Sequence, residues 1–272
     1  MRTTHSTLVL LGCALAGATY GQTPDRIVID GSTGIAPLVT ALATAYRERH
    51  PAVTIEIGKG LGTKARIKAL AEGTIDIAMA SHGLVADQLV KQGMAVQEIA
   101  KVAVVFGVNA TVPATSINDQ HVCAIYAGRL DNWKVLGGPD LAVAARTRPD
   151  TEVDAEIVRQ RVECLAQLRM PDGVRVMSKS GDMARELAGT PGAIGMTTMT
   201  VVDQSQGKIN ALALNGVAPS PENVSSGAYR LTRDSFLVVK TAPAPAVASF
   251  LAFVRGPEGK RVISANGAVP LD

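Results

Sequence analysis

Short blocks of aliphatic and β-branched residues, each followed by small polar residues, dominate the first third of the chain after its leading two dozen residues. The blocks are Arg26–Asp30, Val53–Ile57 and Ile75–Ala80. Blocks of this length, bounded by turn residues, predict β-strands. In an open, mostly parallel α/β sheet the carboxyl ends of the strands share one edge, where ligands bind in a crevice. We therefore expect half of a ligand cleft where these three blocks end.

The segments between these strands have the apolar periodicity of helices. One apolar stripe with spacing i, i+3, i+4, i+7, i+8 follows the first block; it consists of Leu38, Ala41, Leu42, Ala45 and Tyr46. Ser32 or Thr33 can cap this helix, and Pro37 suits its first turn. A second helix is predicted over Ala65–Glu72 and ends at Gly73. Strands that alternate with helices predict the α/β class.

The remaining chain continues the alternation. Val102–Val108 is a continuous apolar run, typical of a strand buried on both faces, and Thr151–Asp154 has the pattern of a capping box for a long helix. Further helices are predicted over Asp119–Ala127, Ser180–Ala188 and Ala244–Arg255, and further strands over Leu141–Ala145, Val174–Met177, Ile194–Thr197, Asn210–Leu214 and Ser235–Val239.

Two crossings between lobes, near residues 105 and 235, follow from this order of elements. They divide the chain into lobe I (24–105 and 236–272) and lobe II (106–235). Two connections permit hinge closure around a ligand. The predicted architecture is thus a two-lobed α/β protein with a cleft between its lobes.

Composition excludes several functional classes. The chain of 272 residues is 47% hydrophobic, which supports a sizeable core, but only 3% aromatic, which leaves little material for stacking bases or sugars. The formal net charge is +3 without a run of basic residues, whereas nucleic-acid binding usually needs a concentrated basic face. We expect no nucleic-acid partner.

The first residues have the pattern of a secretory signal peptide, assigned to residues 1–21. Arg2 precedes a short apolar stretch, Thr7–Ala16, and Ala16–Ala18 fits a small-x-small cleavage site. The stretch is too short to span a bilayer. An alternative is a lipobox that ends at Cys13, which would become acylated; we favour ordinary cleavage because the apolar run before Cys13 is short. Both interpretations place the protein outside the cytoplasm, in the periplasm.

Two cysteines remain after the leader, Cys123 and Cys164. In an oxidising compartment two such cysteines often pair, so we favour a disulfide, with two buried free thiols as the alternative. The four histidines are scattered and no Cys-x-x-Cys occurs. The sequence therefore predicts neither a metal site nor another cofactor.

Candidate ligand-binding residues lie in the turns that follow the first strands. Ser32, Thr33 and Gly34 open a helix, and a helix N-terminus suits an oxyanion, although simple capping is the alternative. Residues 60–65 match the dinucleotide pattern G-x-G-x-x-A, but the next strand ends in Ser81-His82 and not in an acid. A second helix N-terminus with the hydroxyl of Thr63 serves a small anion better.

Two further candidates rest on side-chain chemistry. His82, beside Ser81, ends the third strand, and a functional and a structural role stay equally open. Arg148 precedes the helix of the second lobe, and a guanidinium group suits bidentate binding of a tetrahedral oxyanion. The alternative is a surface arginine paired with acids that follow it, namely Asp150, Glu152 or Asp154. These acids also oppose an anion at this helix end.

Several longer motifs carry a resemblance to a known family. They are residues 31–34 (Gly-Ser-Thr-Gly), 60–63, 76–81 (Asp-Ile-Ala-Met-Ala-Ser), 125–133 (Ile-Tyr-Ala-Gly-Arg-Leu-Asp-Asn-Trp), 190–195 (Thr-Pro-Gly-Ala-Ile-Gly) and 213–223. Over nearly its whole mature length the chain resembles the phosphate-binding proteins of ABC transporters, which have the type II periplasmic binding fold.

The resemblance implies a site and a function. Ser32 and Thr33 match the first anion-holding turn, Thr63 matches a hydroxyl donor, and Arg148 is similar to the anion-clamping arginine, with Arg146 as an alternative alignment. Where the family usually has Asp after Ser81, this chain has His82. Of the Ser-Gly-Thr that usually follows the arginine, only Thr151 matches.

The resemblance further implies an exported, monomeric, non-enzymatic protein that captures phosphate or a related oxyanion for an ABC permease. One alternative is a regulatory or sensor-partner protein on the same fold with a weakened pocket. A third, a thiol or hydrolytic enzyme, is disfavoured because neither a G-x-S-x-G motif nor a spaced nucleophile–base pair is present.

Overall fold

A computed structural model describes residues 25–82 and 84–271. The predicted leader, with its cleavage site and Cys13, lies outside the described residues. Within them the chain forms ten α-helices and a ten-stranded mixed sheet in the order β2-β1-β3-β11-β4-β8-β6-β7, with β9 and β12 paired to β4. The α/β class and the two-lobed architecture that the sequence predicts are confirmed.

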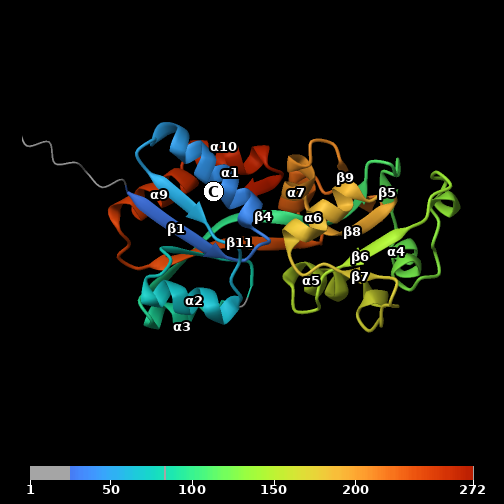
Figure 1. Ribbon diagram of the computed structural model, residues 1–272, viewed down its shortest axis with the longest axis horizontal. Helices are drawn as coiled ribbons and strands as arrows, with labels where there is room; N and C mark the ends of the chain where they lie inside the picture. The colour runs from blue at the N-terminus through green and yellow to red at the C-terminus, as the bar shows by residue number, and fades with distance from the viewer. Residues whose placement is uncertain (1–24, 83, 272) are drawn as a thin grey trace, which may run out of the picture.

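The first lobe is built on three parallel strands. Ile29 lies opposite both Ile57 and Ile77, so the three strands end at one edge of the sheet, as predicted. These strands are β1 (Arg26–Gly31), β2 (Thr54–Ile57) and β3 (Ile77–Ala80). Figure 1 shows helices on both faces of this sheet. One face carries α1 (Ala36–Arg49), α9 (Pro245–Arg255) and α10 (Pro257–Ala265), and the other carries α2 (Thr63–Glu72) and α3 (Ala86–Lys91).

Alternation along the strands explains this layering. Ile27 and Ile29 of β1 pack in the core under α1 and α9, whereas Val28 between them packs against the core under α2 and α3. In β3, Met79 packs in the core under α1 and α9, and Ala78 packs in the core under α2 and α3. Successive strand residues point to opposite faces of a sheet, so strands that are apolar throughout need a helix layer on each side.

The second lobe has its own core, which contains Phe106, Tyr126 and Trp133. Its strands are β6 (Ala144–Thr147), β7 (Arg175–Val176), β8 (Ala193–Thr198) and β9 (Ile209–Ala211), beside a small sheet of β5 (Ser116–Ile117) and β10 (Ala213–Leu214). Its helices are α4 (Asp119–Tyr126), α5 (Val153–Arg161), α6 (Ser180–Gly189), α7 (Met199–Gln204) and α8 (Pro221–Ser225).

Two long strands connect the lobes, β4 (Met94–Asn109) and β11 (Thr232–Lys240). Up to Ala103, β4 pairs with β11, and from Val104 it pairs with β8 of the second lobe. The short strand β12 (Ala268–Pro270) adds to β4 near this change. The chain thus passes between the lobes on two adjacent antiparallel strands (Figure 1). The domain boundaries at 105/106 and 235/236 stay predictions.

The predicted disulfide between Cys123 and Cys164 is confirmed, with the two Cα atoms 6.0 Å apart. It links α4 to the short turn after α5 across a sequence separation of 41 residues. Closing a loop of this length restricts the unfolded chain and stabilises the fold by roughly 4 kcal/mol. The bond therefore fastens the outer part of the second lobe.

Helix capping is where local pattern and structure differ. The prediction that Ser32 or Thr33 caps the first helix is wrong: α1 begins at Ala36 after Ile35, without a side-chain cap, although Pro37 does lie in its first turn. The capping box at Thr151–Asp154 is also absent, and Glu152 is the residue before α5. In both places tertiary contacts use the polar groups, as the site shows. Gly73 ends α2 in a left-handed conformation, as predicted.

The predicted strand Leu141–Ala145 is shifted toward the C-terminus, to Ala144–Thr147. As a consequence Arg146 and Thr147 belong to the strand and not to the loop that follows it. The periodicity analysis missed four helices, α3, α7, α8 and α10. In the part of the chain that the structure describes, none of the helices combines the length and apolar character that crossing a membrane requires.

Candidate functional site

A cavity of about 340 Å³ lies between the lobes, at the edge where β1, β2 and β3 end. The first lobe contributes the turns after these strands and the start of α2, and the second lobe contributes the segments before α5 and α6. The lining residues are Gly31, Ser32, Thr33, Gly60, Leu61, Gly62, Thr63, Arg66, His82, Thr151, Glu152, Ser178 and Lys179. This position agrees with the cleft that the strand pattern predicts.

The carboxylate of Asp30 fastens the two glycine turns of the first lobe to each other. Its Oδ1 accepts the backbone N–H of Gly31 at 2.7 Å and that of Gly60 at 2.9 Å. The φ angle of Gly31 is +139°, and a Cβ there would overlap the backbone of Met79. Only glycine fits this close approach. Asp30 was not among the predicted site residues, because it reads as the last residue of a strand.

The N-terminus of α2 faces the cavity. Gly62 precedes the helix and offers no side-chain cap, so the first N–H groups of α2 are not covered by a capping side chain and the hydroxyl of Thr63 lies beside them. Helix N-termini also carry partial positive charge. This end of the helix therefore suits an oxyanion.

Arg66 supplies the positively charged side chain on the first lobe's side of the cavity. It was not among the site residues predicted from the sequence. Its side chain is almost fully buried, with 1% of the residue exposed, yet it lines the cavity. One terminal nitrogen donates to the carbonyl oxygen of His82, while Nε has no partner among the described residues. Burial lowers the pKa of Arg66, and the negative charge of Glu152 opposes that shift. The spacing i, i+3 between Thr63 and Arg66 is a signal that could have found it.

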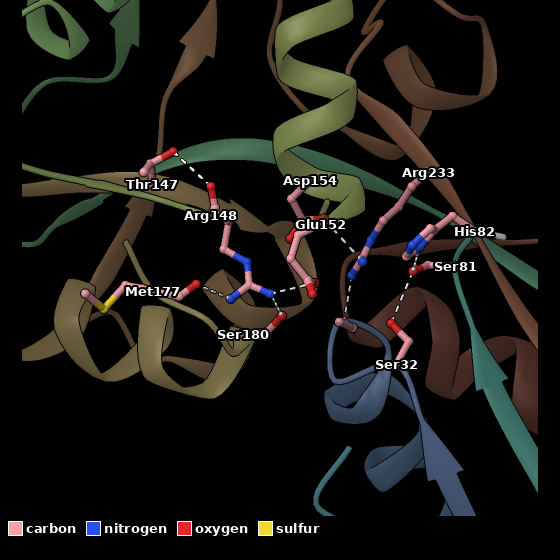
Figure 2. A network of polar contacts seen from close by, with 11 residues as sticks. Ser32, Ser81, His82, Thr147, Arg148, Glu152, Asp154, Met177, Ser180 and Arg233 are labelled. Atoms are coloured by element: carbon pink, nitrogen blue, oxygen red, sulfur yellow. Dashed lines mark hydrogen bonds and ion pairs between the residues drawn. The ribbon is translucent and has the colours of Figure 1, made fainter. Parts of the chain in front are cut away.

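Ser81 and His82 are neighbours in sequence but lie differently relative to the cavity. The hydroxyl of Ser81 lies 3.1 Å from the hydroxyl of Ser32 (Figure 2), and the backbone N–H of Ser32 donates to Met79. These contacts hold Ser32 in the turn, which is why it does not cap α1. Ser81 itself is buried behind the lining, whereas His82 lines the cavity.

Arg148, which the sequence predicts as the anion clamp, lies behind the wall of the second lobe and not in the cavity lining. It is 2% exposed and donates to the carbonyl oxygen of Met177 at 2.7 Å and to Glu152 Oε2 at 2.9 Å (Figure 2). Of the predicted capping box, Asp154 lies 3.2 Å from a terminal nitrogen of Arg233 instead. Arg146, the alternative, also lies outside the lining; its Nε donates to Glu186 at 2.8 Å.

The second lobe presents an ammonium group, a carboxylate and two hydroxyls to the cavity. Lys179 lines it and also donates across the cleft to the carbonyl oxygen of Lys59, at 3.2 Å. Glu152 lines it with its charge met by Arg148. Thr151 and Ser178 supply the hydroxyls. Lys179, Ser178 and Glu152 were not predicted as ligand-binding residues.

Five of the eight predicted site residues thus come together at the cavity: Ser32, Thr33, Thr63, His82 and Thr151. Three do not line it, namely Gly34, Ser81 and Arg148. Between residues 25 and 271, position 83 excepted, no group of His, Cys, Asp or Glu side chains could hold a metal ion. The hydroxyls, the two cations and the helix N-terminus of this lining suit an anion.

Comparison with known proteins agrees with this geometry. Residues 18–258 match the PBP superfamily domain. The chain belongs to the PBP superfamily. One relative, the phosphate-binding protein PstS of Bacillus subtilis, is 26% identical over 282 residues, which cover 97% of this chain and 90% of the relative. A second, PstS of Borreliella burgdorferi, is 24% identical, with 96% and 95% covered.

Solved structures similar to this chain show the same fold. A putative phosphate ABC transporter substrate-binding protein from Clostridium perfringens, solved with bound phosphate, superposes with a TM-score of 0.72 at 26% identity, covering 91% of this chain and 100% of that one. An ABC-type phosphate transport receptor from Vibrio cholerae gives 0.60 at 24% identity, covering 89% and 99%.

Proposed function

We propose that this PBP superfamily protein captures phosphate, or a closely related tetrahedral oxyanion, in the cavity between its lobes and delivers it to an ABC permease. The observation that carries the proposal is Arg66. Its guanidinium group is buried at the cavity wall, its Nε lacks a partner among the described residues, and it lies beside the open N-terminus of α2. A buried, incompletely paired cation needs an anion.

The charges of the lining support a dianion. Arg66 and Lys179 bring two positive charges, and the negative charge of Glu152 is met by Arg148 behind it. Phosphate near neutral pH, which carries between one and two negative charges, matches this balance. The names of the relatives, phosphate-binding and phosphate transporter proteins, support the same ligand.

The proposed role is binding and delivery without chemistry on the ligand. The protein acts as a monomer after export by its first residues, and it has no nucleic-acid partner. The hinge strands β4 and β11 let the cleft open for loading and unloading. The name of one solved relative, a putative phosphate ABC transporter substrate-binding protein, supports coupling to a permease.

Calorimetric titration of the exported protein with phosphate tests the proposal. We expect saturable binding at one site per chain, and weaker binding of sulfate under the same conditions. Absence of heat and of any thermal stabilisation at millimolar phosphate would refute phosphate as the ligand. Uptake of labelled phosphate by cells that lack the gene, compared with cells that carry it, tests delivery to the permease.

A further inference from the structure

Arg233 lies on β11 beside the point where the chain crosses between the lobes, and its side chain is 2% exposed. One terminal nitrogen donates to the carbonyl oxygen of Gly34 in the first lobe, at 2.7 Å. The other lies 3.2 Å from Oδ1 of Asp154 on α5 of the second lobe, whose side chain is 4% exposed. Figure 2 shows the guanidinium group of Arg233 directed toward Asp154.

Both partners of Arg233 adjoin the cavity lining. Gly34 directly follows Ser32 and Thr33, which line the wall of the first lobe. Asp154 lies in the first turn of α5, two residues after Glu152, which lines the wall of the second lobe. Arg233 itself does not line the cavity. One buried guanidinium group therefore connects the two walls from behind.

The glycine at position 34 fits the same arrangement. A Cβ there would lie 2.9 Å from Nη2 of Arg233 and closer still to Nη1. The guanidinium group cannot easily move aside, since Asp154 and the carbonyl oxygen of Gly34 hold it in a buried position. Gly34 thus makes room for Arg233, and this explains why a residue in the predicted anion-binding turn lies outside the cavity lining.

We propose that the Arg233–Asp154 pair, through the hydrogen bond from Arg233 to the carbonyl oxygen of Gly34 in the first lobe, links the lobes and holds the two cavity walls at their ligand-binding separation before an anion arrives. Separating the walls would break the hydrogen bond from Arg233 to Gly34 and leave a buried charged group without one of its partners, which is costly, so the pair favours the arrangement seen here. The apparent affinity of a ligand falls in proportion to the fraction of protein in the competent conformation. The pair therefore raises anion affinity without contacting the anion, a role that goes beyond the proposed binding function.

The direct test measures the separation of the lobes without ligand. Val90 on α3 and Val135 in the second lobe are 61% and 72% exposed, so a cysteine at each accepts a spin label, and the native pair Cys123–Cys164 is already bonded. Pulsed dipolar spectroscopy then gives the distance distribution. We expect a narrow distribution in the parent, and a longer or broader one in Asp154→Asn that narrows again when anion is added.

The matched control is Asp234→Asn, which removes the neighbouring carboxylate of β11 in an exposed ion pair with Lys101. It should change neither the distance distribution nor phosphate affinity, whereas Asp154→Asn should weaken phosphate binding at least tenfold. Identical ligand-free distributions in the parent and in Asp154→Asn would overturn the proposal, as would an unchanged affinity accompanied only by a lower melting temperature.

Gly34→Ala tests the same Arg233 contacts by an independent substitution. Alone it should displace Arg233 and reproduce the effect of Asp154→Asn on the lobe distances. Combined with Arg233→Ala, it should add nothing to the effect of Arg233→Ala, because the clash no longer exists; additive effects would contradict the proposal. The ligand-free distances are informative even where phosphate fails to bind the parent, so this proposal and the proposed function can fail separately.

Discussion

The two walls of the cavity are built by different means. The wall of the first lobe consists of backbone turns and a helix N-terminus, held together by Asp30, with Arg66 as its cation. The wall of the second lobe consists of side chains, and its most basic candidate, Arg148, turns away from the cavity to bind Met177 and Glu152. Turn geometry is encoded locally, whereas the direction of a long side chain depends on partners that are remote in sequence.

This difference predicts which wall contributes more to the free energy of anion binding. The first lobe offers donors fixed by backbone geometry, which lose little freedom when an anion binds. The second lobe offers Lys179, which is on a flexible stem, and the neutralised pair Arg148–Glu152. We therefore expect changes in the first wall to remove anion binding, and changes in the second wall to tune it.

The largest effect is expected from Arg66→Ala. Loss of a charge-assisted contact in a desolvated site should weaken phosphate binding by about 2–5 kcal/mol. Arg66→Lys is the matched control and should retain part of the affinity because it keeps the charge. Calorimetric titration measures both. Phosphate affinity in Arg66→Ala equal to that of the parent would remove Arg66 from the site.

A smaller effect is expected from Arg148→Ala, which leaves the carboxylate of Glu152 without its cation at the cavity wall. Phosphate binding should weaken by about 1.5–3 kcal/mol, the range for hydrogen bonds to charged groups. The double variant Arg148→Ala, Glu152→Gln should recover most of this loss, since the unpaired negative charge is gone. If Glu152→Gln does not rescue binding, Arg148 acts on the anion directly and the second wall rearranges on binding.

The hydroxyl groups should contribute less. Ser32→Ala removes a hydroxyl from the first turn, and Thr151→Val removes one from the second wall. Each should weaken phosphate binding by about 0.5–1.5 kcal/mol, the usual net value of a neutral hydrogen bond. Thr190→Val, at a site that does not line the cavity, is the control. A comparison of the three by calorimetry locates the anion between the walls.

His82 should affect selectivity more than affinity. An imidazole ring can hydrogen-bond an anion, whereas the carboxylate of an aspartate adds a negative charge that repels a fully ionised sulfate. In His82→Asp sulfate should therefore bind more weakly, while phosphate, which can donate its proton to the carboxylate, should be less affected. Sulfate and phosphate titrations of both proteins at neutral pH measure it; an affinity ratio that the substitution leaves unchanged would give His82 a purely structural role.

No effect on binding is expected from the pair Arg146–Glu186. The hydrogen bond from Arg146 holds the pKa of Glu186 below its ordinary value. A carboxylate with a lowered pKa contributes stability above its unfolded-state pKa and loses it as pH falls through the folded-state pKa. Glu186→Gln should therefore lower the melting temperature at neutral pH and have little effect at strongly acid pH, with phosphate affinity unchanged at neutral pH.

Much of the fold follows from sequence periodicity. The strands β1 and β3, the helix α9 and the left-handed stop at Gly73 lie close to their predicted places because each depends on its own apolar pattern or turn residue. Helix α3 was missed since six residues are too few for periodicity to show. The missing caps at Ser32 and Asp154 have another cause, since Ser81 and Arg233 contact these side chains.

The part of the site that consists of backbone turns was predictable from the sequence. The turns at Gly31–Thr33 and Gly60–Thr63 lie at the cavity as expected. The choice between Arg66, Arg146 and Arg148 was not predictable, because each arginine reads as a surface or helix residue until its partners are known. Only the fold shows that Glu186 and Glu152 engage two of them.

A crystal structure with arsenate, whose anomalous scattering marks the anion, tests the central claim most directly. The account predicts one arsenate between the walls, within hydrogen-bonding distance of Ser32, the N-terminus of α2 and the guanidinium group of Arg66. An arsenate bound by Arg146 or Arg148 on the second lobe alone, with Arg66 still directed at the carbonyl oxygen of His82 and remote from the anion, would contradict it.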